Sequence, residues 1–390
     1  MIPLQGRASV SNWVALPSDV WRVAGPNETV NHRVAWHLRN GTQAGAGLYL
    51  TDSEGEAAPG PTLHLSPMLQ HIDVGDVIVV PPDGQRLMVA WKSTATHNSL
   101  LLTERCDNFC IMCSQPPKDR DDSYLYERAE RIISALPSSA RSLGLTGGEP
   151  TIEPGSFLHL LDHCAVRAPQ LAVHILSNGR RFADPEFSRD YASIPLGDVM
   201  VGIPLYGAEP SLHDFVVQAP GAFNQTVKGI LQLASHGSRI ELRVVIQKHT
   251  VPALADIATY IVRNLPFVDQ VALMGLEMTG LARPNASIVW AEPTEYRNEL
   301  REAYAILSDA GVFTRIYNHQ LCVLDEALWP AAVQSISDWK NDFPSLCDPC
   351  TVKKSCAGVF TTSGARVSKH LHPIINPGQL LEATVASSPR

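Results

Sequence analysis

Three cysteines, Cys106, Cys110 and Cys113, lie close together in the run Cys-Asp-Asn-Phe-Cys-Ile-Met-Cys. Thiolates are the ligands that iron-sulfur clusters prefer. Three of them on one tight loop can hold three irons of a cubane and leave the fourth iron without a protein ligand. The run therefore predicts a [4Fe-4S] cluster with one open iron, at which a second molecule can bind and react.

A structural zinc site is the alternative interpretation of this run. Zinc usually takes four tetrahedral ligands, commonly supplied as two spaced pairs. Three cysteines with no histidine nearby fit that pattern poorly. A non-catalytic module that binds zinc through its cysteines is nevertheless kept as a competing hypothesis for the whole chain.

A second group of cysteines lies near the C-terminus, where Cys347, Cys350 and Cys356 have the spacing Cys-x2-Cys-x5-Cys and Cys322 precedes them. Four thiolates can complete an auxiliary [4Fe-4S] cluster with no vacant iron. Zinc is the alternative here too, because four cysteines that include a Cys-x2-Cys pair also make a good tetrahedral site. Electron relay, substrate contact and bracing of the C-terminal region are all open roles for such a site.

From Asn98 onward, the sequence alternates between apolar strands and helices. We expect strands at residues 99–103, 143–146, 172–177, 199–204, 240–246 and 270–274, and helices at 124–136, 157–166, 223–235 and 253–264. A parallel neighbour needs a crossover of a dozen or more residues, so this alternation indicates a parallel sheet. Six strand-helix units are too few for an ordinary eight-stranded barrel, and the expected fold class is α/β with an open, partial (β/α)6 barrel.

The remaining parts of the chain differ in composition. Residues 1–95 contain short alternating segments at 33–38, 46–50, 76–80 and 86–91, which predict a small β-rich domain. The partial barrel is expected at 96–290. A third region at 291–375 should contain a helix at 294–310, a strand at 312–317 and the second cysteine group, and residues 376–390 should form a flexible tail.

Polar motifs follow several of the predicted strands. Ligands collect at the carboxyl ends of strands in parallel α/β folds, so position gives these motifs weight. Gly147 and Gly148 follow the second strand and let the backbone approach a ligand closely, while Glu149 offers a carboxylate to a cation. The alternative is an ordinary glycine turn.

Two further positions are open to two interpretations. Ser177 begins a Ser-Asn-Gly sequence after the third strand, which is also good turn chemistry. Arg243 shares one face of the fifth strand with Glu241, and it either binds an anionic group through its planar donor fork or forms an ion pair inside the barrel.

Taken together, the Cys-x3-Cys-x2-Cys run and the later Gly-Gly-Glu-Pro element resemble the signature of the radical SAM superfamily. The resemblance implies that the partial barrel is a radical SAM barrel. It also implies that the open iron chelates S-adenosylmethionine (SAM) and that reductive cleavage of SAM yields a 5'-deoxyadenosyl radical.

The same resemblance implies a set of SAM-binding residues, which are Met112, Gly147, Gly148, Glu149, Ser177, Arg243 and Gly275. In relatives, the residue at Glu149 bonds the amino group of the methionine moiety, and the strand end at Ser177 touches the ribose. Met112 stands where relatives place a large apolar residue against the adenine. Arg243 would bind the SAM carboxylate, and the backbone at Gly275 would hold the adenine.

The second cysteine group is similar to the SPASM or twitch extensions of radical SAM enzymes that act on peptides. Together with the flanking residues 114–117, the motifs look most like the HxsC type of radical SAM maturase, over residues 98–365. That type is associated with a second radical SAM protein and with a small protein rich in His-Xaa-Ser repeats. The resemblance thus implies a peptide or protein substrate and an electron donor such as flavodoxin or ferredoxin.

Composition limits the other functions. The formal net charge of -8 leaves no general attraction to nucleic acid or to an anionic membrane. This weakens the hypothesis of a radical SAM enzyme acting on a tRNA base, although a small-molecule substrate remains an alternative. No run of about 18 apolar residues and no signal peptide occur, and eight cysteines without an extracellular context favour metal chemistry in the cytoplasm.

Overall fold

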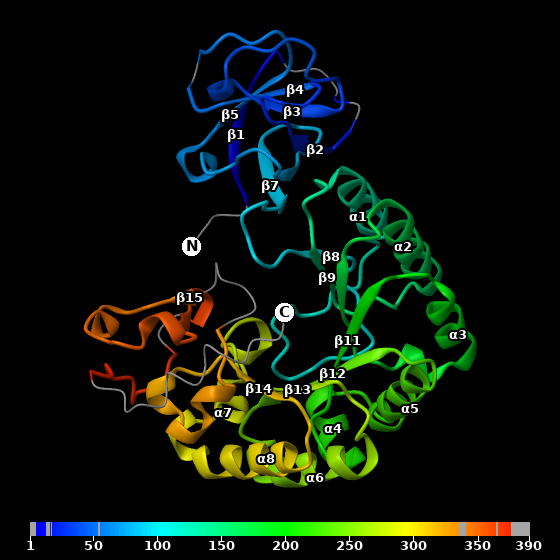
Figure 1. Cartoon of the computed structure of the whole chain (residues 1–390), viewed down its shortest axis with the longest axis vertical. Coiled ribbons are helices and arrows are strands. Elements are labelled where there is room, and N and C mark those ends of the chain that lie inside the picture. The colour runs from blue at the N-terminus through cyan, green and yellow to red at the C-terminus, as the bar shows by residue number, and fades with distance from the viewer. Residues whose placement is uncertain are drawn as a thin grey trace.

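The computed structural model describes residues 5–12, 16, 18–53, 55–334, 341–363 and 366–375. The predicted flexible tail at 376–390 lies outside the described residues. Figure 1 shows a β-barrel at the N-terminal end, a parallel sheet with an outer arc of helices, and a C-terminal segment of short turns and strands. The described parts thus follow the predicted order of a β-rich region, an α/β region and a cysteine-bearing segment.

The N-terminal region is a closed barrel of seven strands in the order β1-β5-β4-β3-β2-β6-β7. Its strands are β1 (Gln5–Ser11), β2 (Val20–Val23), β3 (Val34–His37), β4 (Leu48–Thr51), β5 (Thr62–Leu65), β6 (Val77–Val79) and β7 (Arg86–Trp91). Apolar side chains such as Trp21, Leu48 and Leu63 fill its core. The expectation of a β-rich region is confirmed, although β1, β2, β5 and the closure of the barrel were not anticipated.

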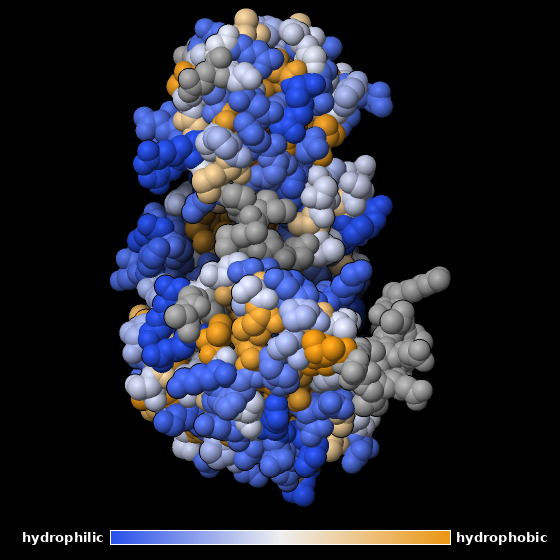
Figure 2. All heavy atoms as spheres, turned by 90° about the vertical axis from the view of Figure 1, so that its left-hand side faces the viewer, coloured by the Kyte–Doolittle hydropathy of each residue, from blue (hydrophilic) through white to orange (hydrophobic). Residues whose placement is uncertain are grey.

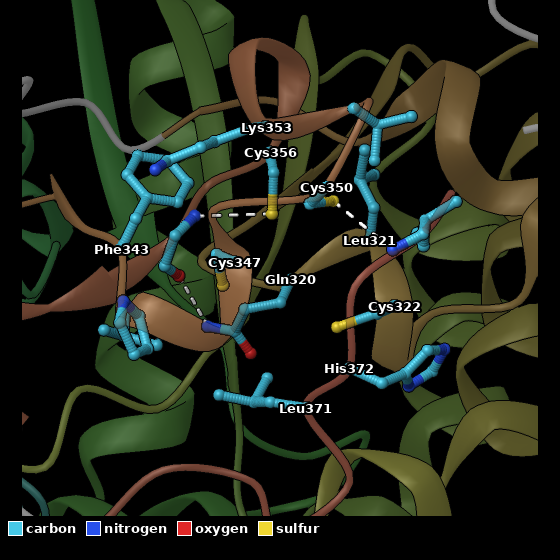
Figure 3. A pocket seen from close by; sticks show the side chains of 15 residues that line it. Gln320, Leu321, Cys322, Phe343, Cys347, Cys350, Lys353, Cys356, Leu371 and His372 are labelled. Atoms are coloured by element: carbon cyan, nitrogen blue, oxygen red, sulfur yellow. Dashed lines mark hydrogen bonds between the residues drawn. The ribbon is translucent and has the colours of Figure 1, made fainter. Parts of the chain in front are cut away.

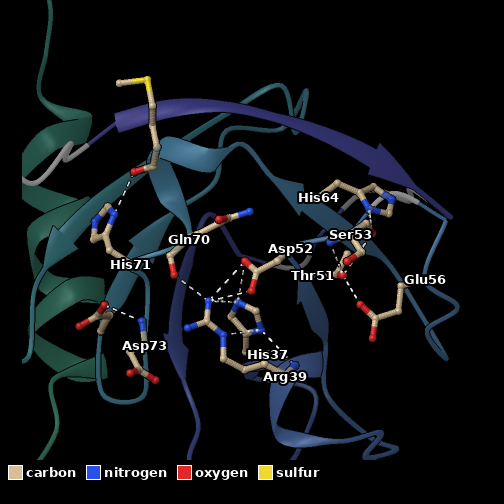
Figure 4. A network of polar contacts seen from close by, with 12 residues as sticks. His37, Arg39, Thr51, Asp52, Ser53, Glu56, His64, Gln70, His71 and Asp73 are labelled. Carbon is tan, nitrogen blue, oxygen red and sulfur yellow. Dashed lines mark hydrogen bonds and ion pairs between the residues drawn. The ribbon is translucent and has the colours of Figure 1, made fainter.

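A polar network occupies one part of this barrel (Figure 4). The guanidinium of Arg39 contacts His37, the carboxylate of Asp52 and the carbonyl of Gln70, with the bond to Gln70 at 2.7 Å. Burial, followed by the charge of Arg39, lowers the pKa of His37 to about 4. The neutral imidazole of His37 therefore contacts the permanently charged guanidinium of Arg39. The hydrogen-bond partners of this arginine all come from the barrel region.

The α/β region contains a seven-stranded sheet whose strands are all parallel and follow one another in sequence order. The strands are β8 (Ser99–Leu101), β9 (Ser142–Thr146), β10 (Ala172–Leu176), β11 (Asp198–Pro204), β12 (Arg239–Ile246), β13 (Gln270–Gly275) and β14 (Thr314–Tyr317). The predicted partial barrel is confirmed. The seventh strand, β14, pairs with β13 and extends the sheet beyond residue 290, where we expected the barrel to end.

Helices accompany the sheet, and most of them cover its outer face (Figure 1). They are α1 (Tyr124–Ala135), α2 (Pro154–Arg167), α3 (Pro185–Ser193), α4 (Pro210–Val217), α5 (Ala222–Ser235), α6 (Leu254–Asn264), α7 (Ala286–Val289) and α8 (Arg297–Asp309). Outward strand residues such as Ile240, Leu242 and Val244 join one large apolar core with six of these helices, whereas α4 and α7 belong to a separate cluster with the cysteine loop. The short helices α3, α4 and α7 were missed, because few residues give a weak periodic signal.

The inner face of the sheet is polar. Glu241 and Arg243 point away from the apolar core, as the period of two requires. A Cβ atom at Gly202 on the neighbouring strand would lie 2.9 Å from Nε2 of His174 and 3.1 Å from Cδ of Arg243. The glycine therefore makes room for these polar side chains inside the partial barrel.

The C-terminal segment is built from turns and a two-stranded sheet of β15 (Asn341–Asp342) and β16 (Val359–Phe360). Short 3-10 turns at Leu321–Val323, Ser345–Cys347 and Lys353–Ser355 carry or flank its cysteines. Figure 2 shows apolar side chains gathered on the lower half of the face that bears this segment. Among the described helices, none combines the length and the apolar character needed to cross a membrane.

Candidate functional site

The loop that carries the first three cysteines follows β8 and is bonded to helix α4. The N–H of Phe109 donates to the carbonyl of Val217 at 2.9 Å, and the N–H of Ile111 donates to the carbonyl of Val216 at 3.0 Å. The loop thus pairs with the last turn of a helix, and its middle is held by main-chain bonds.

The other end of the loop is held by a short turn after β13. The N–H of Leu281 donates to the carbonyl of Cys113 at 2.8 Å. Gly280 has a φ of +54°, and a Cβ atom there would lie 2.2 Å from that same carbonyl oxygen. Only glycine suits this position, both for its backbone conformation and for its close approach to the cysteine loop.

The three thiols lie near one another and are partly shielded from solvent. Burial raises the pKa of Cys106 to about 12, and burial with the neighbouring charges of Cys113 and Cys106 raises the pKa of Cys110. Thiolates at this place need a compensating positive charge, which iron supplies. A donor set made of thiols alone fits an iron-sulfur cluster.

Within the part of the chain that the structure describes, no group of three or more His, Cys, Asp or Glu side chains is arranged to hold a single metal ion. In a cubane, each cysteine binds a different iron.

The Gly-Gly-Glu element after β9 is bonded to the chain that leads into the cysteine loop. The N–H of Gly148 donates to the carbonyl of Thr103, and the N–H of Glu149 donates to the carbonyl of Arg105, both at 2.8 Å. A Cβ atom at Gly148 would lie 2.2 Å from the carbonyl oxygen of Arg105. The glycines permit close approach to neighbouring backbone, and neither Gly147 nor Gly148 has a positive φ.

Glu149 and Ser177, from different strand ends, meet in one network. The Oε1 atom of Glu149 accepts from the hydroxyl of Ser177 at 2.8 Å and from the hydroxyl of Thr151 at 2.6 Å. Its Oε2 atom accepts from the N–H of Asn178 at 2.6 Å. Burial raises the pKa of Glu149, and these donors oppose that rise. The structure therefore fixes the orientation of this carboxylate.

Arg180 is a residue that the sequence did not single out. Its Nη1 atom lies 2.7 Å from the carbonyl of Asp107, 2.8 Å from Oδ1 of Asn108 and 3.0 Å from Oδ2 of Asp107. Both partners lie between Cys106 and Cys110, so Arg180 ties the cysteine loop to the end of β10. Its position directly after the Ser-Asn-Gly sequence was the only signal available.

Asp122 is a second such residue, buried at the base of the cysteine loop. It accepts bonds from the hydroxyl of Thr103, from the N–H of Glu104 at 2.5 Å and from Nε of Arg105 at 3.0 Å. These three donors immediately precede Cys106. The carboxylate therefore holds the chain in place where it leaves β8.

Arg243 forms an ion pair inside the partial barrel, with its Nη1 atom 2.8 Å from Oε1 of Glu241. Glu241 also accepts from Nε2 of Gln270 at 2.6 Å and lies 3.6 Å from Nε2 of His174. The ion pair is the alternative that we weighed for this arginine. One of the five guanidinium donors makes this bond, so the pairing leaves donor capacity for an anionic ligand.

The two residues assigned to the adenine side lie in neighbouring parts of the site. Met112 is buried in an apolar cluster that Leu276, the residue after Gly275, also contacts. The Sδ atom of Met112 accepts a bond from Nε2 of Gln247 at 3.8 Å. Gly275 packs closely against the residue that follows β14, because a Cβ atom there would lie 2.6 Å from the carbonyl of Asn318.

A wide groove runs along the edge of this site. It has an empty volume of about 1000 Å³ and is lined by Asp107 of the cysteine loop, by Glu149 and by side chains from helix α5. Arg180, Arg181 and Lys228 bring positive charge to its walls. The groove thus reaches from solvent to the residues that surround the first three cysteines.

The other four cysteines line one pocket in the C-terminal segment (Figure 3). The pocket has an empty volume of about 370 Å³, and most of its other walls are apolar side chains such as Phe343, Val352 and Ile374. Burial raises the pKa of Cys356, and the N–H of Gly358 opposes that rise by donating to its sulfur at 3.5 Å. The structure thus brings together Cys322, Cys347, Cys350 and Cys356 from three turns.

Two comparisons relate the α/β region to known proteins. The family model for the radical SAM superfamily matches residues 100–260, from strand β8 to helix α6. GTP 3',8-cyclase 1 from Pseudomonas aeruginosa is 26% identical over 307 residues, which cover 73% of this chain and 86% of the cyclase. Residues 100–260 therefore form a radical SAM region, and enzymes with this region use a [4Fe-4S] cluster and SAM as cofactors.

Several solved structures resemble parts of the chain. SuiB from Streptococcus suis matches with a TM-score of 0.43 and 14% identity, over 56% of this chain and 48% of SuiB. The structure of anSMEcpe with bound AdoMet and Cp18Cys peptide matches with a TM-score of 0.44 and 14% identity, over 56% of this chain and 62% of anSMEcpe. This chain spans about half the length of SuiB.

Proposed function

We propose that this radical SAM enzyme modifies a ribosomally made peptide or protein, of the His-Xaa-Ser repeat type that the HxsC resemblance implies. The groove beside the cysteine loop is the observation that carries the proposal. It lies beside Asp107 of the cysteine loop and is lined by Glu149, so a substrate bound in it would lie close to the proposed SAM site.

The residues proposed to bind the cofactors are those given by the motifs. Cys106, Cys110 and Cys113 would hold the cluster, and the bound cluster and SAM would together supply a 5'-deoxyadenosyl radical that removes a hydrogen atom from the substrate. Glu149 would accept a bond from the SAM amino group, since its carboxylate is already held in one orientation. Ser177 beside it would face the ribose.

The remaining proposed contacts complete the SAM site. Gly147 and Gly148 would shape the loop that carries Glu149. Arg243 would donate to the SAM carboxylate while it remains bonded to Glu241. Met112 and the backbone of Gly275 would hold the adenine from the apolar side of the loop.

An auxiliary [4Fe-4S] cluster is proposed for Cys322, Cys347, Cys350 and Cys356. Four thiols in one apolar pocket, with main-chain N–H groups donating to two of their sulfurs, are a suitable environment for such a cluster. Zinc remains the competing occupant, since it accepts the same four ligands. Iron and zinc analysis of protein purified without oxygen distinguishes the two.

A small-molecule substrate is the second candidate function. It is favoured by the relative from Pseudomonas aeruginosa, whose name states that it cyclises GTP. That relative matches 73% of this chain, and a nucleotide is therefore the specific small molecule that we propose to test. The tRNA version is weaker, because the net charge of -8 opposes binding of a polyanion.

The remaining proposals concern context. We keep the division into domains at 1–95, 96–290 and 291–375 as a proposal, with β14 as a shared element of the sheet. The proposed partners are a flavodoxin-like or ferredoxin-like electron donor and a second radical SAM protein. A cytoplasmic location is proposed because free thiols persist in reducing compartments.

One experiment tests the proposal against its rival. Oxygen-free protein is incubated with SAM and dithionite, together with either a His-Xaa-Ser repeat peptide or GTP. We expect release of 5'-deoxyadenosine in step with a mass change in the peptide, measured by liquid chromatography and mass spectrometry. A product formed from GTP, with the peptide unchanged, would transfer the assignment to the small-molecule class.

A further inference from the structure

We propose that residues 371–375 form part of the auxiliary site and that their main-chain N–H groups set the reduction potential of the cluster held there. This inference rests on the auxiliary cluster proposed above. It adds to that proposal a segment that contains no cysteine and follows the last cysteine by fifteen or more residues.

The first observation is that two of the four sulfurs face donors from this segment. The N–H of Ile374 donates to Sγ of Cys350 at 3.5 Å. The main-chain N–H of His372 faces the sulfur of Cys322. Figure 3 shows His372 beside Cys322 on the wall of the pocket. His372 and Ile374, which belong to one short segment, thus face two different cysteine ligands.

The second observation is that the segment is fixed from the cysteine side. The N–H and the hydroxyl of Thr351 each donate to the carbonyl of Ile374 at 2.9 Å. Thr351 directly follows Cys350, so the turn that carries this cysteine and the segment that donates to it are tied together. Ile374 is therefore held close to Cys350 from both sides of its own residue, through its carbonyl and through its N–H.

The third observation is that the segment covers the pocket with apolar atoms. Leu371 and Ile374 line it together with Phe343 and Val352. Exclusion of water strengthens an N–H bond to sulfur, because the local dielectric constant falls. The donors are thus placed where their effect on a charged group is largest.

The expected effect follows from charge. One-electron reduction adds negative charge to a thiolate-ligated cluster, and N–H groups that donate to its sulfurs stabilise the reduced form more than the oxidised form. Removal of such a donor should make reduction less favourable. A tenfold fall in the reduction equilibrium constant corresponds to about 59 mV for one electron.

The test uses proline, which removes an N–H group and keeps the carbonyl. We would introduce Ile374→Pro or His372→Pro into the full chain that already carries Cys106→Ala, Cys110→Ala and Cys113→Ala, so that the auxiliary cluster is the only iron site. Ile374→Ala and His372→Ala are the matched controls, since they retain the N–H. The readouts are iron content and a redox titration followed by electron paramagnetic resonance.

We expect each proline variant to lower the reduction equilibrium constant about tenfold, with little change in its alanine control. Loss of iron from the proline variants alone also supports the proposal, because the donors are then needed to retain the cluster. Unchanged potentials in iron-loaded proline variants overturn it, and so does an equal effect of alanine and proline. A parent protein that contains zinc or no iron refutes the auxiliary cluster itself, which is a separate failure.

Discussion

The two cysteine groups offer the same type of ligand in different surroundings. The first group supplies three thiols on a loop beside a wide polar groove, where Glu149 and Arg180 surround the loop. The second supplies four thiols inside a small pocket with mostly apolar walls. The site with three thiols thus has polar surroundings, and the site with four thiols has apolar surroundings. This difference agrees with the proposed roles, because a cluster with an open iron needs polar neighbours for its ligand. A cluster with four protein ligands needs only shielding from water.

Removal of the cysteine ligands should show the difference between the two sites most strongly. We expect alanine at Cys106, Cys110 and Cys113 to abolish cleavage of SAM, because the cluster that delivers the electron is lost. Alanine at Cys347, Cys350 and Cys356 should leave some cleavage that is uncoupled from product. The amount of 5'-deoxyadenosine released and the iron content per chain measure the effects of both sets of substitutions. Complete loss of cleavage in a folded protein of the second kind would contradict the division of roles.

A pair of glycines tests whether the two sites are independent. Gly280→Ala places a Cβ atom against the carbonyl of Cys113 at a φ of +54°, and Gly358→Ala places one 2.7 Å from the carbonyl of Asp342 at a φ of +64°. Each change costs about 1–2 kcal/mol in backbone conformation alone. We expect Gly280→Ala to reduce SAM cleavage at least about tenfold and Gly358→Ala to reduce it far less. Equal losses in the two variants would show that the sites are coupled.

Arg180 offers a test confined to the first site. Arg180→Gln removes the bonds to Asp107 and Asn108, and we expect the rate of SAM cleavage to fall about tenfold, or about 1.4 kcal/mol. Arg181→Gln is the matched control, because Arg181 is an exposed cation on the same groove. The reduction potential of the auxiliary cluster should not change in either variant. Equal rates for the two variants would remove Arg180 from the framework of the site.

The smallest expected effect comes from single hydroxyl groups. Ser177→Ala removes one donor to Glu149, and we expect SAM to bind about three- to tenfold more weakly, which corresponds to the roughly 0.5–1.5 kcal/mol of one hydrogen bond. Thr351→Val removes the matching hydroxyl at the second site and leaves the N–H bond to Ile374. Calorimetric titration with SAM should show no change for Thr351→Val.

Much of the fold was readable from periodic patterns. Helix α1 was expected at 124–136 and is Tyr124–Ala135, because its apolar residues recur at helical spacing. Strand β12 was expected at 240–246 and is Arg239–Ile246. The closure of the N-terminal barrel was not readable, since pairing between strands as distant as β1 and β7 leaves no local signal.

The site was predictable only where a motif marks it. The cysteines and Glu149 can be recognised by residue type and spacing. Arg180 and Asp122, in contrast, act through contacts with backbone that is distant in the sequence. Gly280 is a clearer example, because a lone glycine carries no indication of which carbonyl it approaches. Such positions depend on how distant segments pack, and packing is a property of the folded chain.

The closed N-terminal barrel limits how that region can recognise anything. Every one of its seven strands is paired on both sides, with β1 joining β5 to β7. An extended peptide that binds by adding itself to a sheet needs an unpaired strand edge, and the described barrel presents none. If the barrel recognises a substrate or partner protein, it must therefore contact that molecule through its loops and outer face. Point substitutions on those surfaces should then alter the binding specificity.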